Sequence, residues 1–468
     1  MAGKIREMID SVIAQRAMGN PMLEKIIKTK LILKGVNPNK YTLQSDDEPQ
    51  VLEKIEKMLM ELSHIGQAPA TSPTPEPVKT PDVVKATARI SPPVKKLDTS
   101  DIITAYSTKD TVDEIVKDIS QQIGFFDTKL LLFFASSKFA PDDMSLKMQE
   151  TFPFSSVFGC STSGEIVSGK MLDNSVVAMA FSPHAVQDAK IEVIENLQDK
   201  DGVKRAFDSF AKYFEKPVAE LDPHKYVGLI LVDGLSGAEE KLIETIGDMT
   251  NVVFVGGSAG DDLKFTSTSL YAKGECYSNA AILAVLKPGT DFTFIKTQSF
   301  CNLGKTLNVT KADEKNRIVY EFNGKPAAVA YAETVGVSVE EASKFFMHNP
   351  VGLVIEGEPY VRSPQQIKEN GSMAFYCGVG EGMELSLLES TDIIKDTRDS
   401  INKAVAELGN ASGIINFNCI LRTLELKQKN LTGEYGELFS SIPTIGFSTY
   451  GEAYIGHINQ TATMLVFK

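Results

Sequence analysis

The N-terminal part of the chain carries apolar residues at the spacing of amphipathic helices. They recur about every 3.6 positions in separate stretches before residue 65, the first running from Ile5 to Ile13. Asn20-Pro21 is a typical helix start, and Gly35 a typical helix end. The pattern predicts a small helical domain, or head, over residues 1–65.

Residues 66–98 break this pattern. The composition shifts to Ala, Pro, Thr, Ser and Lys, with seven prolines. A segment of this kind buries too little apolar surface to offset the entropy lost on ordering, and its prolines favour extended conformations. We therefore expect a Pro-rich linker.

Beyond the linker, short apolar runs alternate with amphipathic helices. The run 129–135 lies between helical patterns at 111–123 and 142–151, and a similar order returns from residues 226 and 382. Strands separated by helices of about ten to fifteen residues indicate an α/β fold. We expect mixed sheets built from an internally repeated strand-helix-strand unit, preceded by the all-α head and the Pro-rich linker.

A glycine-serine segment repeats within this body. Phe158–Glu165 has the order apolar, Gly, any residue, Ser, then Gly and an acid, and Val255–Asp262 and Ile445–Glu452 share it. Gly159 and Gly256 are 97 positions apart, and Gly446 follows Gly256 by 190. The spacing predicts one unit used four times, with one copy diverged, and each glycine-serine segment is expected to form a turn.

Charge and length exclude some classes of protein. The net charge of −13 divides into +3 before residue 99 and −16 beyond it, so the acidic body is a poor match for nucleic acid. Lys25, Lys28, Lys30 and Lys34 give the second helix a basic side, which fits either DNA or a solvated face. No apolar run reaches the roughly 18 residues of a membrane span. We expect a soluble cytoplasmic protein.

Common catalytic and metal-binding patterns are missing from the sequence. The five cysteines include no Cys-x-x-Cys pair, which favours reduced thiols over a metal site. Ser161 and Ser448 stand in Gly-x-Ser-x-x-Gly, one residue longer than a nucleophile elbow. We expect no catalytic residues, no metal and no enzymatic activity. No i, i+4 histidine pair occurs, and His348 and His457 are the histidines to test as haem ligands.

Several segments together resemble a known family. Phe158–Ile166, with the apolar run before it and Val255–Asp261 after it, resembles the N-terminal module of the FIST family, named for F-box and intracellular signal transduction proteins. The segments that resemble its C-terminal module are Glu321–Ala327, Pro350–Gly352, Tyr360–Arg362, Asn418–Arg422 and Gly446–Glu452. The resemblance implies an N-terminal module over residues 99–317 and a C-terminal module over residues 318–468.

The resemblance also implies a function. It implies an intracellular sensory protein that binds a small ligand, an amino acid or similar metabolite, and relays occupancy to a signalling partner. Some members are described as binding haem and responding to nitric oxide, so a haem-based sensor is one alternative. A regulator that binds DNA through the helical head is another.

The ligand site is expected where the outer two glycine-serine segments meet Arg422. Glycine lets a backbone approach a ligand closely, and the guanidinium of Arg422 suits a carboxylate while a glutamate suits an ammonium group. A structural role for the glycines and an internal ion pair for Arg422 remain open. The candidate ligand-binding residues are Gly159, Ser161, Thr162, Gly164, Glu165, Arg422, Gly446, Ser448, Thr449 and Glu452.

Overall fold

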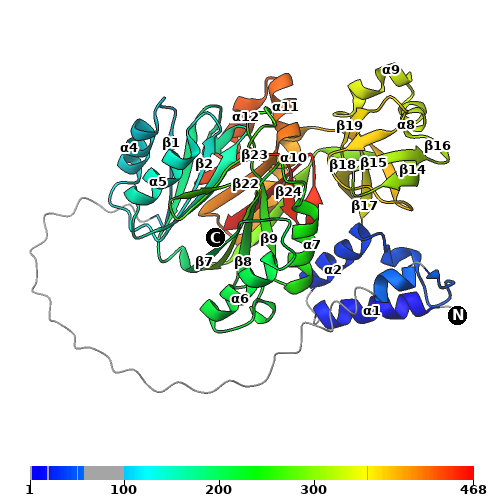
Figure 1. The fold of residues 1–468 in the computed structure, drawn as a ribbon, viewed down its shortest axis with the longest axis horizontal. Coiled ribbons are helices and arrows are strands. Elements are labelled where there is room, and N and C mark those ends of the chain that lie inside the picture. The colour runs from blue at the N-terminus through cyan, green and yellow to red at the C-terminus, as the bar shows by residue number, and fades with distance from the viewer. Residues whose placement is uncertain (1–2, 18–20, 50, 57–99, 356) are drawn as a thin grey trace, which may run out of the picture.

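The head is a group of short helices packed against the side of the body (Figure 1). The computed structural model describes residues 3–17, 21–49, 51–56, 100–355 and 357–468. The expected linker lies outside the described residues. The head contains α1 (Lys4–Ala17), α2 (Pro21–Leu33), the short 3-10 helix η1 (Pro38–Lys40) and a helical turn over residues 51–56. Within these residues, the helical head expected from the 3.6-residue period is confirmed.

Three six-stranded sheets of the body share one pattern. In each, two parallel strands are joined by one helix or, in the third sheet, by two. An antiparallel strand pairs with one of them, and a fourth strand pairs with that antiparallel strand. The first unit contains β1 (Ile102–Ser107), α4 (Val112–Ile123), β2 (Leu130–Ser136), α5 (Pro141–Thr151), β3 (Ser156–Thr162) and β6 (Val176–Phe181). The second contains β7 (Val186–Ile194), α6 (Gly202–Phe214), η3 (Val218–Glu220), β8 (Val227–Val232), α7 (Glu239–Met249), β9 (Phe254–Ser258) and β12 (Ala281–Pro288). The third contains β13 (Phe292–Gln298), α10 (Ile393–Leu408), β22 (Gly413–Cys419), α11 (Ile420–Gln428), α12 (Thr432–Glu437), β23 (Thr444–Thr449) and β26 (Thr461–Phe467).

Each unit sends a hairpin into the sheet of another unit. The hairpins are β4 (Glu165–Val167) with β5 (Lys170–Leu172), β10 (Leu270–Ala272) with β11 (Glu275–Tyr277), and β24 (Glu452–Tyr454) with β25 (Gly456–Ile458). The first unit's β4 pairs with β23, the second unit's β10 with β3, and the third unit's β24 with β9. The exchange is therefore cyclic, and it ties the three units into one body.

An eight-stranded antiparallel sheet is inserted in the third unit, between β13 and α10. It appears in yellow beside the body in Figure 1 and contains β14 (Phe300–Asp313), β15 (Ile318–Phe322), β16 (Lys325–Pro326), α8 (Ala327–Val335), α9 (Val339–Ala342), η4 (Ser343–Phe345), β17 (Val351–Ile355), β18 (Glu358–Arg362), β19 (Pro364–Ile367), β20 (Met373–Phe375) and β21 (Glu384–Ser390). The described residues hold three copies of the unit, so the expectation of four was wrong. The insertion accounts for the double spacing between Gly256 and Gly446.

The three repeated sheets pack their inner faces on a common core, and helices cover their outer faces. Leu132, Leu231 and Phe417, one from each sheet, belong to the same buried cluster. α4 and α5, α6 and α7, and α10 to α12 pack on the outer faces of the respective sheets. Strands buried on both faces are apolar at nearly every position, which explains the continuous apolar runs of the sequence.

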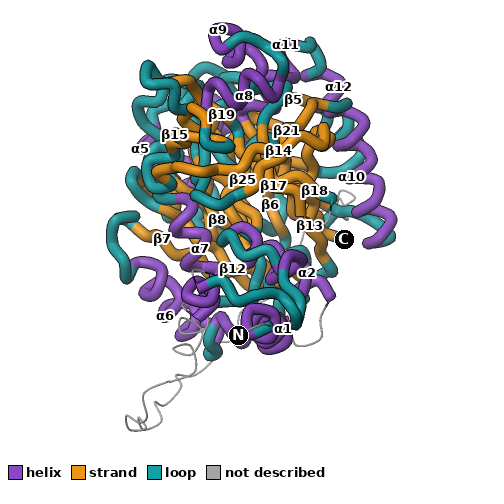
Figure 2. The backbone as a smooth tube through the Cα atoms, turned by 90° about the vertical axis from the view of Figure 1, so that its right-hand side faces the viewer, coloured by secondary structure: helices purple, strands orange, loops and turns teal. Residues whose placement is uncertain are grey.

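The tube view shows helices around a centre of strands, with the head against one side (Figure 2). Among the helices in the described parts of the chain, none is long and apolar enough to cross a membrane. The proposed division of the body at residue 317 stays a prediction.

Candidate functional site

The repeated glycines lie inside strands rather than in turns. Gly159, Gly256 and Gly446 occupy β3, β9 and β23, and only Gly164 of the first segment has a positive φ, +121°. A Cβ on Gly159 would stand 1.8 Å from the Phe133 carbonyl oxygen of the parallel neighbour, and the other two glycines face the same obstacle. The expected turns were therefore misplaced. Glycine is needed here because neighbouring backbones approach closely.

The hydroxyl and carboxyl groups of the first segment bind within the protein. The Ser161 hydroxyl donates to the Gly260 carbonyl over 2.8 Å and accepts from the Ser269 amide over 2.9 Å. Glu165 accepts from the Thr162 hydroxyl and from the amide and hydroxyl of Ser175. Burial raises the pKa of Glu165 to about 8, so this side chain is mostly protonated at neutral pH.

The last segment is buried in the same way. The Ser448 and Thr423 hydroxyls lie 2.7 Å apart, and the Thr449 hydroxyl donates to the Ser258 carbonyl. Glu452 accepts from the amide and hydroxyl of Thr461, while its Oε1 has no partner among the described residues. Burial raises the pKa of Glu452 to about 8.

Arg422 is fully buried, with an exposed fraction of 1%, and its guanidinium binds neutral groups. Nε donates to Asn418 Oδ1 over 3.0 Å, and the two terminal nitrogens donate to the hydroxyls of Ser299 and Thr397 over 3.3 and 2.8 Å. The side chain thus already has a hydrogen-bond partner at each nitrogen.

The structure brings the outer segments together, because β4 pairs with β23. Ile166 lies opposite Gly446, and Ser448 exchanges backbone hydrogen bonds with Ser163 and Gly164. A cavity of about 350 Å³ reaches this junction, lined by Gly164, Met171, Leu172, Asp173, Thr423, Lys427, Asn430, Thr432 and Ser448. Of the ten candidate residues only Gly164 and Ser448 line this cavity.

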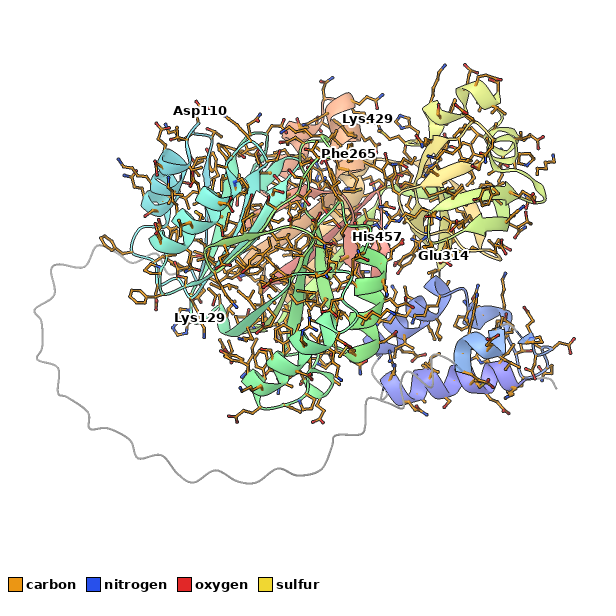
Figure 3. The ribbon with its side chains drawn as sticks, in the orientation of Figure 1. Asp110, Lys129, Phe265, Glu314, Lys429 and His457 are labelled. Atoms are coloured by element: carbon orange, nitrogen blue, oxygen red, sulfur yellow. The ribbon has the colours of Figure 1, made fainter. Side chains whose placement is uncertain are left out.

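A larger cavity of about 490 Å³ lies where the second unit, the inserted sheet and the head meet. Figure 3 shows His457 and Glu314 at this junction. Its lining includes Lys30, Lys34, Lys54, Glu240, Ile243, Glu244, Gly247, Asp248, Glu314, Arg362, Gly378, Met383, Ile455, Gly456 and His457. Charged side chains predominate, and they come from all three parts of the molecule.

Two buried side chains in this cavity each hold a nitrogen that binds no other residue of the described chain. Arg362 is the last residue of β18 and His457 the middle residue of β25, and each is 6% exposed. Within the described ranges, the hydrogen bonds of Arg362 are long, 3.4 Å each, to the carbonyls of Val361 and His457. Arg362 Nε and His457 Nδ1 have no hydrogen-bond partner among the described residues. Leaving a buried polar group unpaired costs about 1–3 kcal/mol, so the unused donor and acceptor favour a ligand or water at this place.

Burial controls the charge of His457. Burial lowers its pKa to about 4, and Arg317 and Arg362 lower it further, while the negative charge of Glu240 opposes this. The imidazole is therefore neutral at pH 7, and a hydrogen bond to the Tyr376 backbone contributes to its environment. Nδ1 is then available as a hydrogen-bond acceptor.

Acidic groups form the opposite part of the lining. Glu240 accepts from the Gly378 amide over 2.5 Å and lies 3.6 Å from Arg317, which also contacts Glu239 over 3.4 Å. Glu314 forms no ion pair with another described residue, and burial, with Glu240 nearby, raises its pKa. Arg317 thus holds the inserted sheet against α7, while Glu314 keeps a free carboxyl group beside the cavity.

The sequence pointed to some residues of this cavity separately but gave no sign that they lie close together. Gly456-His457 was singled out only as a possible haem ligand, Arg362 as part of a motif, and Glu240 and Glu314 not at all. The sequence signal for this cavity was the family resemblance around Tyr360–Arg362. Arg362 and His457 are 95 positions apart, and only the cyclic hairpin exchange brings them together.

Comparison with known proteins agrees with the resemblance. The FIST N domain matches residues 129–325 and the FIST C domain residues 327–454. The Uncharacterized protein MJ1623 of Methanocaldococcus jannaschii is 24% identical over 310 residues, which span 62% of this chain and 59% of that relative. FIST domains are generally sensory domains that bind small ligands in signal transduction. With its N and C domains both matched, the chain belongs to the FIST family.

Proposed function

We propose that this protein senses a small metabolite bearing a carboxylate, such as an amino acid, in the cavity beside Arg362 and His457. The observation that carries the proposal is the pair of unpartnered nitrogen groups in this charged cavity. A guanidinium offers paired N–H donors that match the two oxygens of a carboxylate.

An amino acid also has a donor for the acceptors of the cavity. Its ammonium group would donate to the free carboxylate of Glu314 or to Nδ1 of His457. A cavity of about 490 Å³ has room for a ligand of this size. The bound metabolite would thus satisfy groups that the protein leaves unpaired.

A second candidate position is the smaller cavity at Gly164 and Ser448. Its support is that two of the ten residues expected to bind ligand line it. The hydroxyls of Thr423 and Ser448 in its lining already bind each other, and Lys427 pairs with Asp173 over 2.8 Å. Arg422 does not line this cavity, and its guanidinium binds other polar side chains. We therefore rank this position second.

The haem and DNA alternatives gain less support. The cavity at His457 is lined mainly by charged side chains, which fit poorly against an apolar porphyrin face. On the head, Lys25 contacts Glu358, and Lys34 contacts Glu244 and Asp248, so these basic groups bind the acidic body. Binding of haem or DNA stays a prediction.

The test is a thermal-shift screen against amino acids and related carboxylates, followed by titration calorimetry. A ligand at 100 times its dissociation constant adds about 2.7 kcal/mol to the free energy of unfolding. Arg362→Met should weaken the binding of any compound found by at least about tenfold, while Ser448→Ala should leave it unchanged. Binding lost only in Ser448→Ala would move the ligand to the second cavity. A screen in which nothing binds would contradict the proposal.

A further inference from the structure

The head forms one wall of the proposed ligand cavity. Its lining includes Lys30 of α2, Lys34, the residue that follows α2, and Lys54 of the helical turn over residues 51–56. Lys34 lies 2.9 Å from Glu244 and 3.1 Å from Asp248 of α7. Any change of charge in the cavity therefore acts on the groups that hold the head in place.

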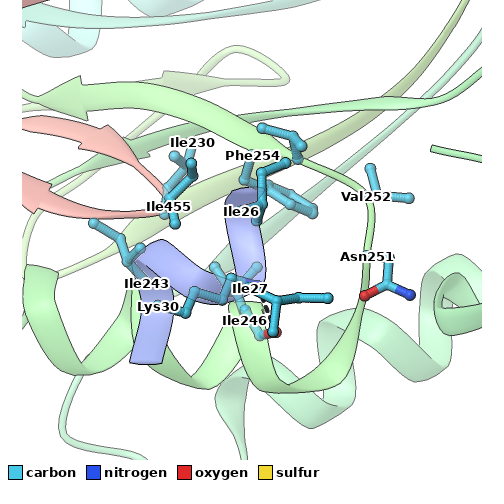
Figure 4. A pocket seen from close by; sticks show the side chains of 12 residues that line it. Ile26, Ile27, Lys30, Ile230, Ile243, Ile246, Asn251, Val252, Phe254 and Ile455 are labelled. Carbon is cyan, nitrogen blue, oxygen red and sulfur yellow. Dashed lines mark hydrogen bonds between the residues drawn. The ribbon is translucent and has the colours of Figure 1, made fainter. Parts of the chain in front are cut away.

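Two kinds of contact seat the head on α7. Ile26 and Ile27 face Ile243, Phe254 and Ile455 across an apolar gap of about 30 Å³, too small for a metabolite (Figure 4). Lys30 donates to the Gly247 carbonyl over 3.0 Å, and Arg16 donates to the Asp248 carbonyl over 3.0 Å. These carbonyls belong to the last turn of α7, where the helix dipole favours cations.

The cavity wall opposite the head contains charges of both signs. Arg362, which forms no ion pair with another described residue, lines the same cavity as the three lysines of the head, and like charges that share a cavity repel one another. Glu314 attracts Lys54, whose positive charge in turn lowers the pKa of Glu314 against the larger effect of burial. Arg362 is buried, and Lys30 and Lys34 are partly buried, so solvent screens their charges less than those of exposed side chains. Lys54 and Glu314 are exposed.

We propose that an anionic group bound at Arg362 tightens docking of the head, so that the head reports occupancy of the cavity. This regulation rests on the proposed function of the same site. A ligand of net negative charge, such as a dicarboxylate, neutralises Arg362 and weakens the repulsion between Arg362 and the three lysines of the head. Because coupling is reciprocal, a docked head raises the affinity for the anion by the same factor.

Hydrogen exchange of the α2 amides in the full-length chain tests the coupling without a ligand. Arg362→Met imitates the neutralised guanidinium and should slow α2 exchange about two- to fivefold, the size expected for one partly screened charge. Glu314→Gln should speed it by a similar factor. Lys28→Ala is the matched control, because Lys28 pairs only with Glu24 of the same helix among the contacts described. Exchange of α10, in the third unit, serves as the reference for global stability.

The outcomes separate the coupling from the proposed function. Opposite shifts in the two charge variants, with α10 and Lys28→Ala unchanged, support the coupling. Equal shifts in the same direction, or α2 rates unchanged in both variants, overturn it. A metabolite screen without a binder contradicts the proposed function alone, since these exchange rates are measured in the absence of ligand.

Discussion

The Arg362 guanidinium lies 3.4 Å from the backbone carbonyl of His457, and both side chains hold a buried nitrogen that no other described residue binds. One residue ends a strand of the inserted sheet, and the other belongs to the hairpin that the third unit contributes to the second. The pairing depends on the way in which the units are assembled.

The protonation of His457 makes stability depend on acidity. Because burial lowers its pKa to about 4, the folded protein binds fewer protons than the unfolded chain between pH 6.5 and 4. Stability is full above about pH 6.5 and falls as the pH drops towards 4, by about 2 to 4 kcal/mol from this residue. His457→Gln should flatten that part of the profile, measured as the urea unfolding midpoint at pH 7 and pH 4.5. An equally steep fall in the variant would show that His457 is charged or exposed in the folded protein.

Glu165 should make the folded protein less stable as the pH rises, which is the opposite of the effect of His457. Burial raises its pKa to about 8, so the folded protein binds more protons than the unfolded chain between about pH 4.5 and 8. Its contribution is full below pH 4.5 and is lost as the pH rises through 8. Glu165→Gln should reduce the loss of stability between pH 5.5 and 8.5, as measured by thermal unfolding. If both proteins lose the same stability over this range, the carboxyl group is ionised when folded.

The repeated glycines should tolerate no side chain. A Cβ at Gly446 would stand 2.2 Å from the Asn416 carbonyl oxygen, so Gly446→Ala requires β22 and β23 to separate. We expect a loss of about 3 kcal/mol or more, or an insoluble protein. Gly433→Ala is the control, because nothing stands within 4 Å of its added methyl group. Similar unfolding midpoints for the two variants would contradict the close approach of the strands.

Much of the repeated unit could be predicted from local patterns. Amphipathic helices such as α4 and α10, and continuous apolar strands such as β2 and β22, carry their period in neighbouring residues. The family resemblance rested on the same segments. These features are visible because helix and strand periods are properties of one stretch of chain.

The partners of short strands could not be predicted. β4 and β24 are three residues long, and nothing in such a stretch tells whether it pairs within its own unit or with another. The inserted sheet was largely missed because strands such as β14 are mostly exposed and lack a continuous apolar run. The cavity was missed for both reasons, since its walls come from an exchanged hairpin, the inserted sheet and the head.

The most direct test of the account is calorimetric titration of a metabolite found in the screen into three full-length proteins: the unaltered chain, Arg362→Met and Ser448→Ala. We predict that the unaltered chain and Ser448→Ala bind with the same dissociation constant. Arg362→Met should lose at least about tenfold in affinity, since charge-assisted hydrogen bonds contribute about 1.5–3 kcal/mol. Unchanged binding in Arg362→Met would contradict the placement of the ligand beside Arg362 and His457.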